Sequence, residues 1–219
     1  MNAAGHPGRR TIVKVCGLTN LADARAALEA GADWLGFIVR ATSPRLIEPA
    51  KAAGIAAALP GAVTVAVMSE VTPGEALDVA RAAGAARVQL HRVDPNAWPA
   101  DFPLPCAFSA GVDGEGAFHG AIPPEPHLVL LDTVSSTLAG GTGRTFPWAA
   151  AHDLAARRAV MLAGGLDGAN VAAAMIAARP FGVDASSRLE REPGLKDHDK
   201  VRRFVAAVRA CDAGFAGTA

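Results

Sequence analysis

The amino-acid sequence predicts an α/β protein built as a single (β/α)8 TIM barrel. Short runs rich in β-branched residues alternate with Ala-rich stretches of helical spacing, the pattern of repeated βα units around a parallel sheet. The length of 219 residues leaves one large domain or two small ones open. Eight such units in about 200 residues favour a closed barrel, because a doubly wound sheet of eight strands usually has a less regular rhythm. We see no linker that would divide the chain.

Short apolar runs are the predicted strands, and Gly, Ser, Asp or His residues stand at or near their ends. Runs of this length and composition are typical of buried strands. The eight runs cover residues 11–17, 33–39, 62–68, 87–91, 106–111, 127–133, 159–165 and 181–186. We therefore assign residues 11–212 to the barrel, residues 1–10 to a flexible N-terminal tail and residues 213–219 to a C-terminal tail.

Helix signals follow most of these strands. Asn20 and Asp197 can accept hydrogen bonds from the free N–H groups of a first turn, and Pro73 suits a first helical position. Gly31 and Gly84 can end helices in the left-handed conformation. No helix is predicted after the fifth strand, because residues 103–126 are rich in Pro and Gly. The predicted helices cover residues 21–30, 48–59, 73–84, a short piece near 95–100, 147–156, 168–178 and 197–210.

The charge balance limits the partners that we expect. Twenty-one basic residues balance twenty-one acidic ones without a run of like charge, so neither a nucleic-acid surface nor a polybasic membrane surface is indicated. The chain begins without the apolar segment of a signal peptide, and no segment approaches about 18 uncharged apolar residues, so export and membrane spanning are not expected. Three cysteines, Cys16, Cys106 and Cys211, form no regular framework. Reduced thiols and a cytoplasmic location are therefore predicted.

The functional groups of a barrel of this kind lie at the carboxyl ends of the strands, because those ends and the loops after them form the pocket. This rule selects candidate residues directly from the predicted strands. They are Cys16, Ser43, Arg45, Ser69, His91, Asp132, Gly164, Gly165, Asp184, Ser186 and Ser187.

Gly164 and Gly165 predict a phosphate site. Paired glycines let backbone N–H groups approach a ligand closely, and Ser186 and Ser187 add hydroxyl donors after the next strand, so a phosphorylated small-molecule substrate is expected. The glycines alone could form only a tight turn. Residues 140–146 are also Gly-rich but lack the Lys-Ser/Thr ending of a nucleotide-binding loop. We interpret them as a mobile loop over the pocket.

Cys16 and Asp132 are the candidate acid–base pair. A thiolate can accept a proton from carbon, a protonated Asp can donate one to oxygen, and the two residues could face each other across the mouth of the barrel. Other interpretations are open: Cys16 as a small buried hydrophobe, Asp132 as a cap for the loop after it, and His91 as a packing residue instead of a base. Neither the His spacing nor the distant cysteines indicate a metal site.

Short motifs occur in order from about residue 12 to residue 209: KVCGLT, GADWLGF leading to SPR, VQLH, LLDT followed by GGTGRTFPW, LAGGL with NV, and GVDASS followed by EREPGLKD. Together they resemble the motifs of the phosphoribosylanthranilate isomerase family of tryptophan biosynthesis. The resemblance implies a single (β/α)8 barrel that performs an Amadori rearrangement without a cofactor. The implied substrate is N-(5-phosphoribosyl)anthranilate, and the implied product is 1-(2-carboxyphenylamino)-1-deoxyribulose 5-phosphate.

The resemblance also implies roles for single residues. Cys16 is similar to the family's general base and Asp132 to its general acid, while Arg45 resembles the residue that holds the anthranilate carboxylate, with a surface ion pair as the alternative. Asp184 would position donors, since a bare carboxylate beside phosphate would repel the anion. The candidate substrate-binding residues are thus Arg45, His91, Gly164, Gly165, Asp184, Ser186 and Ser187.

Several residues depart from the family pattern around the pocket. The departures are Met68, Ser69 and Glu70 where Phe-Val-Asn is usual, and Arg92 and Arg188 where Gly is usual. Arg188 could strengthen phosphate binding or pair with Glu190 or Glu192. Two other functions stay open: the related isomerase of histidine biosynthesis, which has an Asp where Cys16 stands, and a catalytically weak ligand-binding barrel. A monomer and a homodimer are both open.

Overall fold

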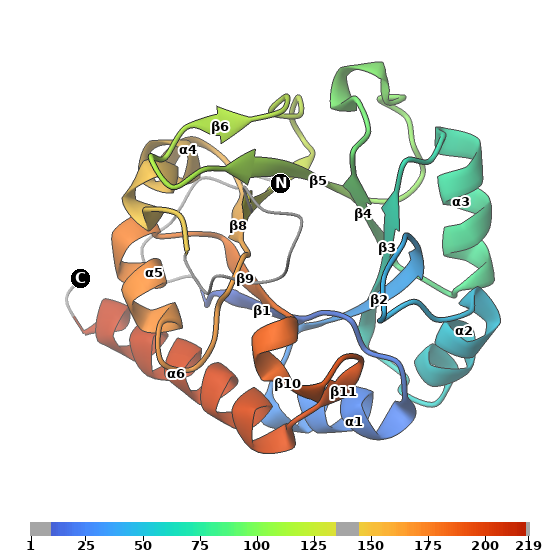
Figure 1. Ribbon diagram of the computed structural model, residues 1–219, viewed down its shortest axis with the longest axis horizontal. Coiled ribbons are helices and arrows are strands. Elements are labelled where there is room, and N and C mark those ends of the chain that lie inside the picture. Colours follow the sequence, from blue (N-terminus) through green and yellow to red (C-terminus); the bar gives the residue numbers. More distant parts are fainter. Residues whose placement is uncertain (1–9, 135–144, 218–219) are drawn as a thin grey trace.

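The computed structural model describes residues 10–134 and 145–217, and in this part of the chain eight parallel strands close into a barrel (Figure 1). Neighbours follow the chain order around the ring, and β9 pairs with β1 to close it. The predicted (β/α)8 barrel is confirmed. Its strands are β1 (Ile12–Val15), β2 (Trp34–Arg40), β3 (Val63–Ser69), β4 (Arg87–His91), β5 (Cys106–Val112), β7 (Leu128–Thr133), β8 (Val160–Leu162) and β9 (Gly182–Ala185).

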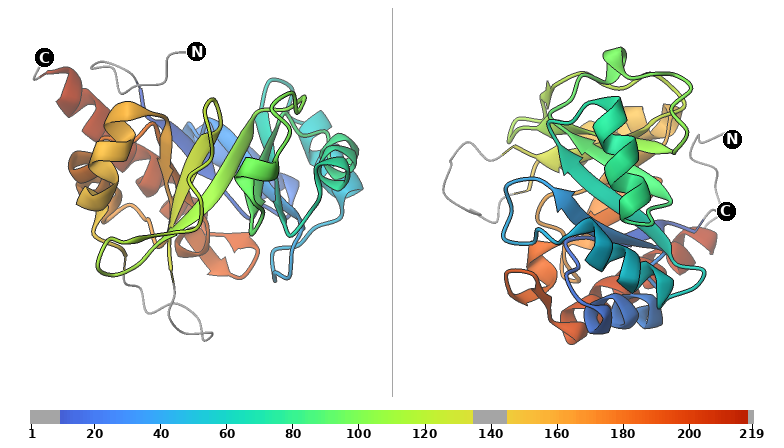
Figure 2. Two further views of the ribbon diagram at one scale, coloured as in Figure 1. Left: turned by 90° about the horizontal axis from the view of Figure 1, so that it is seen from above. Right: turned by 90° about the vertical axis from the view of Figure 1, so that its right-hand side faces the viewer.

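Helices form the outer layer, and Figure 2 shows them from the side of the barrel. Asn20 accepts a hydrogen bond from the N–H of Asp23, and Asp197 accepts one from the N–H of Asp199, so both predicted caps are confirmed. Gly31 ends the first helix with a φ of 100°. The helices are α1 (Leu21–Ala30), α2 (Pro49–Ala57), α3 (Pro73–Ala82), α4 (His152–Arg157), α5 (Val171–Ala178) and α6 (His198–Ala216), with short helical turns η1 (Pro95–Ala97), η2 (Trp148–Ala151) and η3 (Ser187–Leu189).

Two short hairpins were not predicted. The Pro- and Gly-rich segment 103–126 contains β6 (Phe118–His119), which lies antiparallel to β5. After β9, the strand β10 (Glu190–Glu192) pairs with β11 (Leu195–Lys196), and Gly194 between them has a φ of 83°. Left-handed backbone of this kind favours glycine. The second hairpin lies directly beside the carboxyl end of β9.

The two ends of the chain differ in how far the structure describes them. Helix α6 continues to Ala216, so the domain boundary predicted at residue 212 lies inside a helix. The expected N-terminal tail lies outside the described residues except for Arg10.

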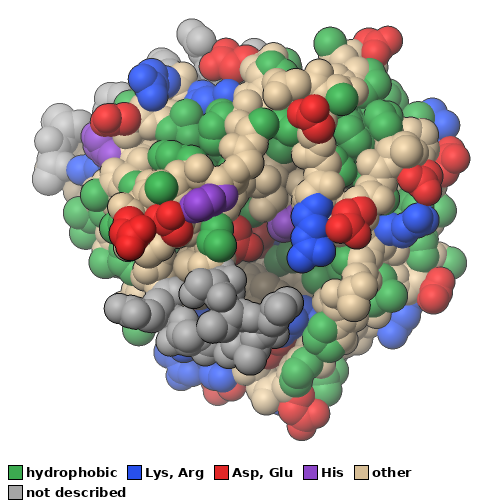
Figure 3. Space-filling model, turned by 45° about the horizontal axis from the view of Figure 1, so that its top comes forward, with side chains coloured by type: hydrophobic (Ala, Val, Ile, Leu, Met, Phe, Trp, Pro, Cys, Tyr) green, Lys and Arg blue, Asp and Glu red, His purple; other side chains and the backbone are tan. Residues whose placement is uncertain are grey.

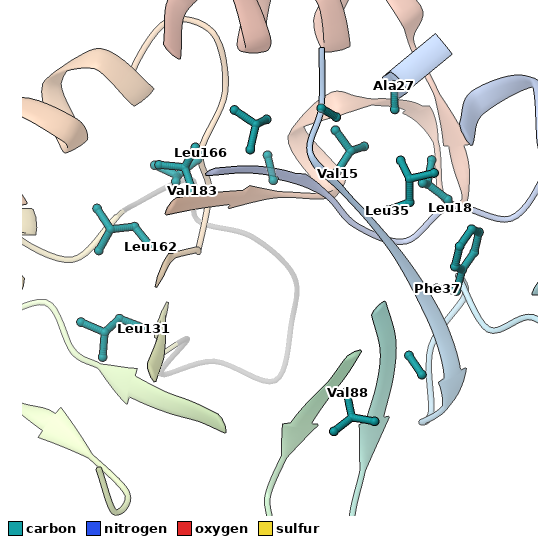
Figure 4. Close-up of a cluster of buried hydrophobic side chains, with 14 of the residues drawn as sticks. Val15, Leu18, Ala27, Leu35, Phe37, Val88, Leu131, Leu162, Leu166 and Val183 are labelled. Carbon is teal, nitrogen blue, oxygen red and sulfur yellow. The ribbon is translucent and has the colours of Figure 1, made fainter. Parts of the chain in front are cut away.

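Alternation along the strands separates two apolar layers, because successive side chains of a strand point to opposite faces. Outward side chains such as Val15, Leu35 and Val183 belong to the large buried cluster that the helices cover (Figure 4). Inward side chains fill the barrel as a second cluster. This inner cluster contains Cys16, Trp34, Val65, Val67, Leu130, Met161 and Ala163.

A polar clamp holds the amino end of the barrel. Asp33, just before β2, accepts hydrogen bonds from the N–H of Val13 and from Arg209, each at 2.8 Å. Asp212 accepts a hydrogen bond from Oγ1 of Thr11 at 2.6 Å. These contacts tie the first strand to the start of the second and to the last helix.

We expect Asp33→Ala to destabilise the fold. The substitution leaves the buried N–H of Val13 without its carboxylate acceptor and removes one acceptor of the Arg209 guanidinium, which should lower the free energy of unfolding by about 2 to 3 kcal/mol. Urea denaturation measures this difference. Asp78→Ala, at an exposed position of α3, is the matched control and should change the same quantity by less than about 0.5 kcal/mol. Equal stability of the two variants would contradict the clamp.

Candidate active site

A cavity of about 260 Å³ lies at the carboxyl ends of the strands. Figure 3 shows a hollow bordered by acidic, basic and His side chains. The cavity brings together most of the candidate residues predicted from the sequence. Its lining consists of Cys16, His91, Asp132, Gly164, Gly165, Asp184, Ser186 and Ser187, with Ile38, Val67, Gln89, Leu130, Ala163, Leu166 and Arg188. Of the loop predicted at 140–146, residues 140–144 lie outside the described residues.

Cys16 enters the cavity from the end of β1 and is 5% exposed. Its N–H donates to the carbonyl of Ala185 on β9 at 2.9 Å. Gly36 on β2 leaves room for the sulfur, because a Cβ there would lie 2.9 Å from Sγ of Cys16 and 3.0 Å from Nζ of Lys14. Burial raises the pKa of the Cys16 thiol, and the charge of Lys14 opposes that rise. The sulfur is a buried thiol with a cation beside it.

Lys14 is a site residue that the sequence analysis missed. It is fully buried inside the barrel, and its Nζ donates to Oδ2 of Asp184 at 2.9 Å. The two residues are direct partners in the register of β1 and β9. Burial would lower the pKa of Lys14, but the contacts with Asp184 and Cys16 together more than compensate, and the pKa is raised. The signal was available in the sequence, since Lys14 lies two residues before Cys16 and so shares its inward face.

Asp132 lies on β7 and lines the same cavity. Burial, reinforced by the charge of Asp184, raises the pKa of Asp132 to about 6. The carboxyl therefore keeps its proton at pH values where an ordinary Asp is ionised. Gly164 allows β8 to approach closely: its φ is 83°, and a Cβ there would lie 2.7 Å from Oδ1 of Asp132.

The predicted phosphate residues lie at the ends of the neighbouring strands β8 and β9 and line the cavity together. Gly164 and Gly165 both have positive φ, 83° and 71°, a backbone shape that exposes N–H groups and suits anions. The side chain of Asn170 donates to the carbonyl of Gly165 at 2.9 Å and holds this turn. Ser186 and Ser187 add hydroxyl groups to the lining.

His91 lines the cavity as a neutral imidazole. Burial, together with the charges of Lys14 and Arg92, lowers the pKa of His91 to about 4. Its Nε2 lies 2.9 Å from Nε2 of Gln89. At neutral pH such a ring can donate one hydrogen bond to a ligand and accept another, but it is a weak base.

Arg45 is not part of the cavity lining. Its Nε and a terminal nitrogen donate to the two carboxylate oxygens of Glu190 at 2.8 and 2.7 Å, and Nζ of Lys196 donates to Glu190 at 2.8 Å. Burial would raise the pKa of Glu190, but these two cations lower it. The structure therefore holds Arg45 in an ion pair, as the alternative interpretation allowed, although its partner is buried.

Two of the residues that depart from the family pattern form a pair at the rim. Glu70 and Arg92 follow β3 and β4, have φ values of 57° and 54°, and approach within 3.6 Å. Left-handed backbone favours the Asn and Gly that the family usually has at these positions. At both positions this chain therefore has a residue that is less suited to left-handed backbone than the one usual in the family. Met68 is buried in the outer core, while Arg188 lines the cavity.

Other site types find no support in residues 10–134 and 145–217. No group of three or more His, Cys, Asp or Glu side chains in these ranges could hold a metal ion. No helix within them is both long and apolar enough to cross a membrane. Cys16, Cys106 and Cys211 are free thiols.

The fold and the site together define a class of protein. A closed (β/α)8 barrel with a buried thiol, a buried carboxyl and a turn suited to anions in one cavity is an enzyme scaffold for proton transfer on small phosphorylated molecules. A family model described as N-(5'-phosphoribosyl)anthranilate (PRA) isomerase matches residues 13–207. The chain belongs to this family.

Individual relatives agree with the family match. The N-(5'-phosphoribosyl)anthranilate isomerase of Pelobacter propionicus is 39% identical over 88% of this chain and 93% of its own. The crystal structure of phosphoribosyl anthranilate isomerase from Thermotoga maritima has a TM-score of 0.77 at 33% identity, and the match covers 91% of this chain and 99% of that one.

A further solved structure is that of the isomerase in complex with reduced 1-(o-carboxyphenylamino)-1-deoxyribulose 5-phosphate. Its TM-score is 0.73 at 31% identity, and the match covers 91% of this chain and 99% of that one. The chain is therefore an isomerase, and these similarities give no support to the histidine-pathway alternative.

We expect Gly36→Ala to disturb the site and the fold. The new Cβ would lie 3.1 Å from Cα of Cys16 as well as close to its sulfur, so the free energy of unfolding should fall by about 1 to 3 kcal/mol. Gly54→Ala is the matched control, because a Cβ at this exposed helical position meets nothing within 4 Å. It should raise the same quantity by up to about 1 kcal/mol. Chemical denaturation of both variants measures the free energy of unfolding. A Gly36→Ala protein as stable as the control would refute the close packing.

Proposed function

We propose that the protein rearranges N-(5'-phosphoribosyl)anthranilate to 1-(2-carboxyphenylamino)-1-deoxyribulose 5-phosphate in tryptophan biosynthesis. The observation that carries the proposal is that Cys16 and Asp132 line one cavity with Gly164 and Ser186. A reduced form of the proposed product is named in the complex of a family member. The free thiols fit a cytoplasmic location.

The first step opens the sugar ring. Asp132 donates its proton to the ring oxygen while the C1′–O bond breaks, and the lone pair of the anthranilate nitrogen forms a C=N bond at C1′. This leaves a Schiff base. A carboxyl with a pKa of about 6 suits this role, because it is still partly protonated close to neutral pH.

The second step moves a proton from carbon. The thiolate of Cys16 takes the proton from C2′, the electrons of that C–H bond form a C1′=C2′ bond, and those of the C=N bond return to nitrogen. The resulting enolamine gains a proton at C1′ and loses the proton of its 2′-hydroxyl, which leaves the ketone. Electrons move only within the substrate, so the net change is an isomerisation.

Substrate binding is assigned to the remaining residues. Gly164, Gly165, Ser186 and Ser187 would bind the phosphate through N–H and hydroxyl groups. Arg45 would hold the anthranilate carboxylate, which requires its guanidinium to exchange Glu190 for the substrate. His91 and Asp184 would contact the sugar from the cavity wall.

The wild-type protein should consume phosphoribosylanthranilate that is generated in place and followed by its fluorescence. Cys16→Ser should reduce kcat by at least about 100-fold, because an alcohol is a far weaker acid than a thiol and supplies little anionic base. Cys106→Ser is the matched control, since that thiol lies in the outer core and its loss should leave kcat within about twofold. Rapid turnover by a folded Cys16→Ser enzyme would remove Cys16 from the mechanism.

The pH dependence of kcat tests Asp132. The pKa of this carboxyl is raised to about 6, so the proton that it donates is present below that pH and lost above it, and kcat should fall as the pH rises through this region. Asp132→Asn should lower kcat by about 100-fold, remove this fall and leave KM nearly unchanged. Steady-state kinetics from pH 5 to 9 provide the measurement. A variant with near-normal kcat would exclude the role.

A further inference from the structure

Lys14 and Asp184 form an ion pair in the interior of the barrel, and both side chains are almost fully buried. An apolar pair would fill such a space at equal or lower energetic cost, because taking two charges out of water is expensive. Several neighbouring inward positions are apolar, including Val65, Leu130 and Met161. The two charges therefore call for an explanation beyond packing.

The cationic end of the pair lies beside the sulfur of Cys16. Lys14 and Cys16 share the inward face of β1, and one Cβ position on Gly36 would lie within 3.0 Å of both Nζ and Sγ. Burial raises the pKa of the Cys16 thiol, and the charge of Lys14 is the strongest influence that lowers it. The opposing charge of Asp184 acts more weakly at this thiol.

The anionic end of the pair acts on Asp132 instead. Among the described residues, Oδ1 of Asp184 is buried and accepts no hydrogen bond, and Asp184 and Asp132 line the same cavity. After burial, the charge of Asp184 is the strongest influence that raises the pKa of Asp132, and the opposing charge of Lys14 is weaker there. The ion pair thus acts to lower the pKa of the Cys16 thiol and to raise the pKa of the Asp132 carboxyl.

The other charged groups near Cys16 have different partners. Lys196 and Arg45 both interact with the charge of the thiolate, but each is hydrogen-bonded to Glu190. His91 is neutral near pH 7, because burial lowers its pKa to about 4. Lys14 is therefore the main cation that acts on the sulfur among the described residues.

We propose that the Lys14–Asp184 pair is a positioning element of the proposed isomerisation, in which Lys14 stabilises the thiolate of Cys16 while Asp184 keeps the proton on Asp132. One buried ion pair then sets the protonation states of both the base and the acid. The inference deepens the proposed function, because it assigns the source of the protonation states that the two proton transfers need. Neither residue donates or accepts a proton in the reaction itself.

The test measures the thiolate directly. Iodoacetamide reacts only with a thiolate, which displaces iodide and forms an S–C bond, so the alkylation rate of Cys16 against pH reports its titration. Peptide mapping by mass spectrometry separates Cys16 from Cys106 and Cys211. The full-length variants are Lys14→Met, Lys14→Arg, Asp184→Asn and Lys14→Met/Asp184→Asn. The double variant leaves no unpaired buried charge and is the one to use where Lys14→Met does not fold.

The proposal makes predictions of opposite sign. Lys14→Met and the double variant should move the alkylation profile to higher pH, and Lys14→Met should lower kcat at least tenfold, of the order expected for weakened general-base catalysis. Lys14→Arg should restore the profile toward that of the wild type. Asp184→Asn should move the fall of kcat above pH 6 to lower pH, because Asp132 loses the charge that helps it to keep its proton. If the pair had a purely structural role, the titration of Cys16 and that of Asp132 would not shift in opposite directions.

Arg209→Met is the matched control, because it breaks ion pairs at the amino end of the barrel. It should lower stability while leaving the alkylation profile unchanged and kcat within about twofold. The proposal is overturned if the profiles of Lys14→Met and the double variant coincide with the wild type, or if Arg209→Met shifts the profile equally. Since alkylation needs no turnover, a wild-type protein inactive on phosphoribosylanthranilate would reject the proposed function without deciding this result.

Discussion

Pairing of β9 with β1 closes the barrel and also brings Lys14 opposite Asp184. Because strand side chains alternate, the register that packs Val13 and Val15 against the helices turns Lys14 and Cys16 inward. A slip of one residue would place the lysine in the apolar layer and the valines inside the barrel. The same hydrogen bonds therefore determine closure, core packing and the position of the thiol.

Burial in the cavity favours the neutral form of Asp132 and of His91. The pKa of Asp132 rises to about 6 and that of His91 falls to about 4, in each case mainly because burial penalises the charged state. Charges persist where they are paired, as in the contact of Lys14 with Asp184. The cavity thus offers a neutral acid and a neutral imidazole at the pH where a surface Asp would already be ionised.

Much of the fold was predictable from the sequence because each βα unit carries its own hydrophobic period. Cys16 and Asp132 could be selected because the carboxyl ends of parallel strands converge. The same rule missed Lys14, which lies inside a strand, and strands of two residues such as β6 and β11 are too short to show a period. The pairing of Arg45 with Glu190 joins residues 145 positions apart, and no local pattern reports such a contact.

The clamp at the amino end has a consequence for how the chain matures. Thr11 and Asp212 are 201 positions apart, and Lys14 and Asp184 are 170 apart. On the ribosome, β1 emerges first but has an unpaired edge until β9 follows, and such edges invite association with other chains. The cavity is completed only when β9 and the residues directly after it arrive. The first strand of a nascent chain therefore lacks its partner β9 until most of the chain has been synthesised.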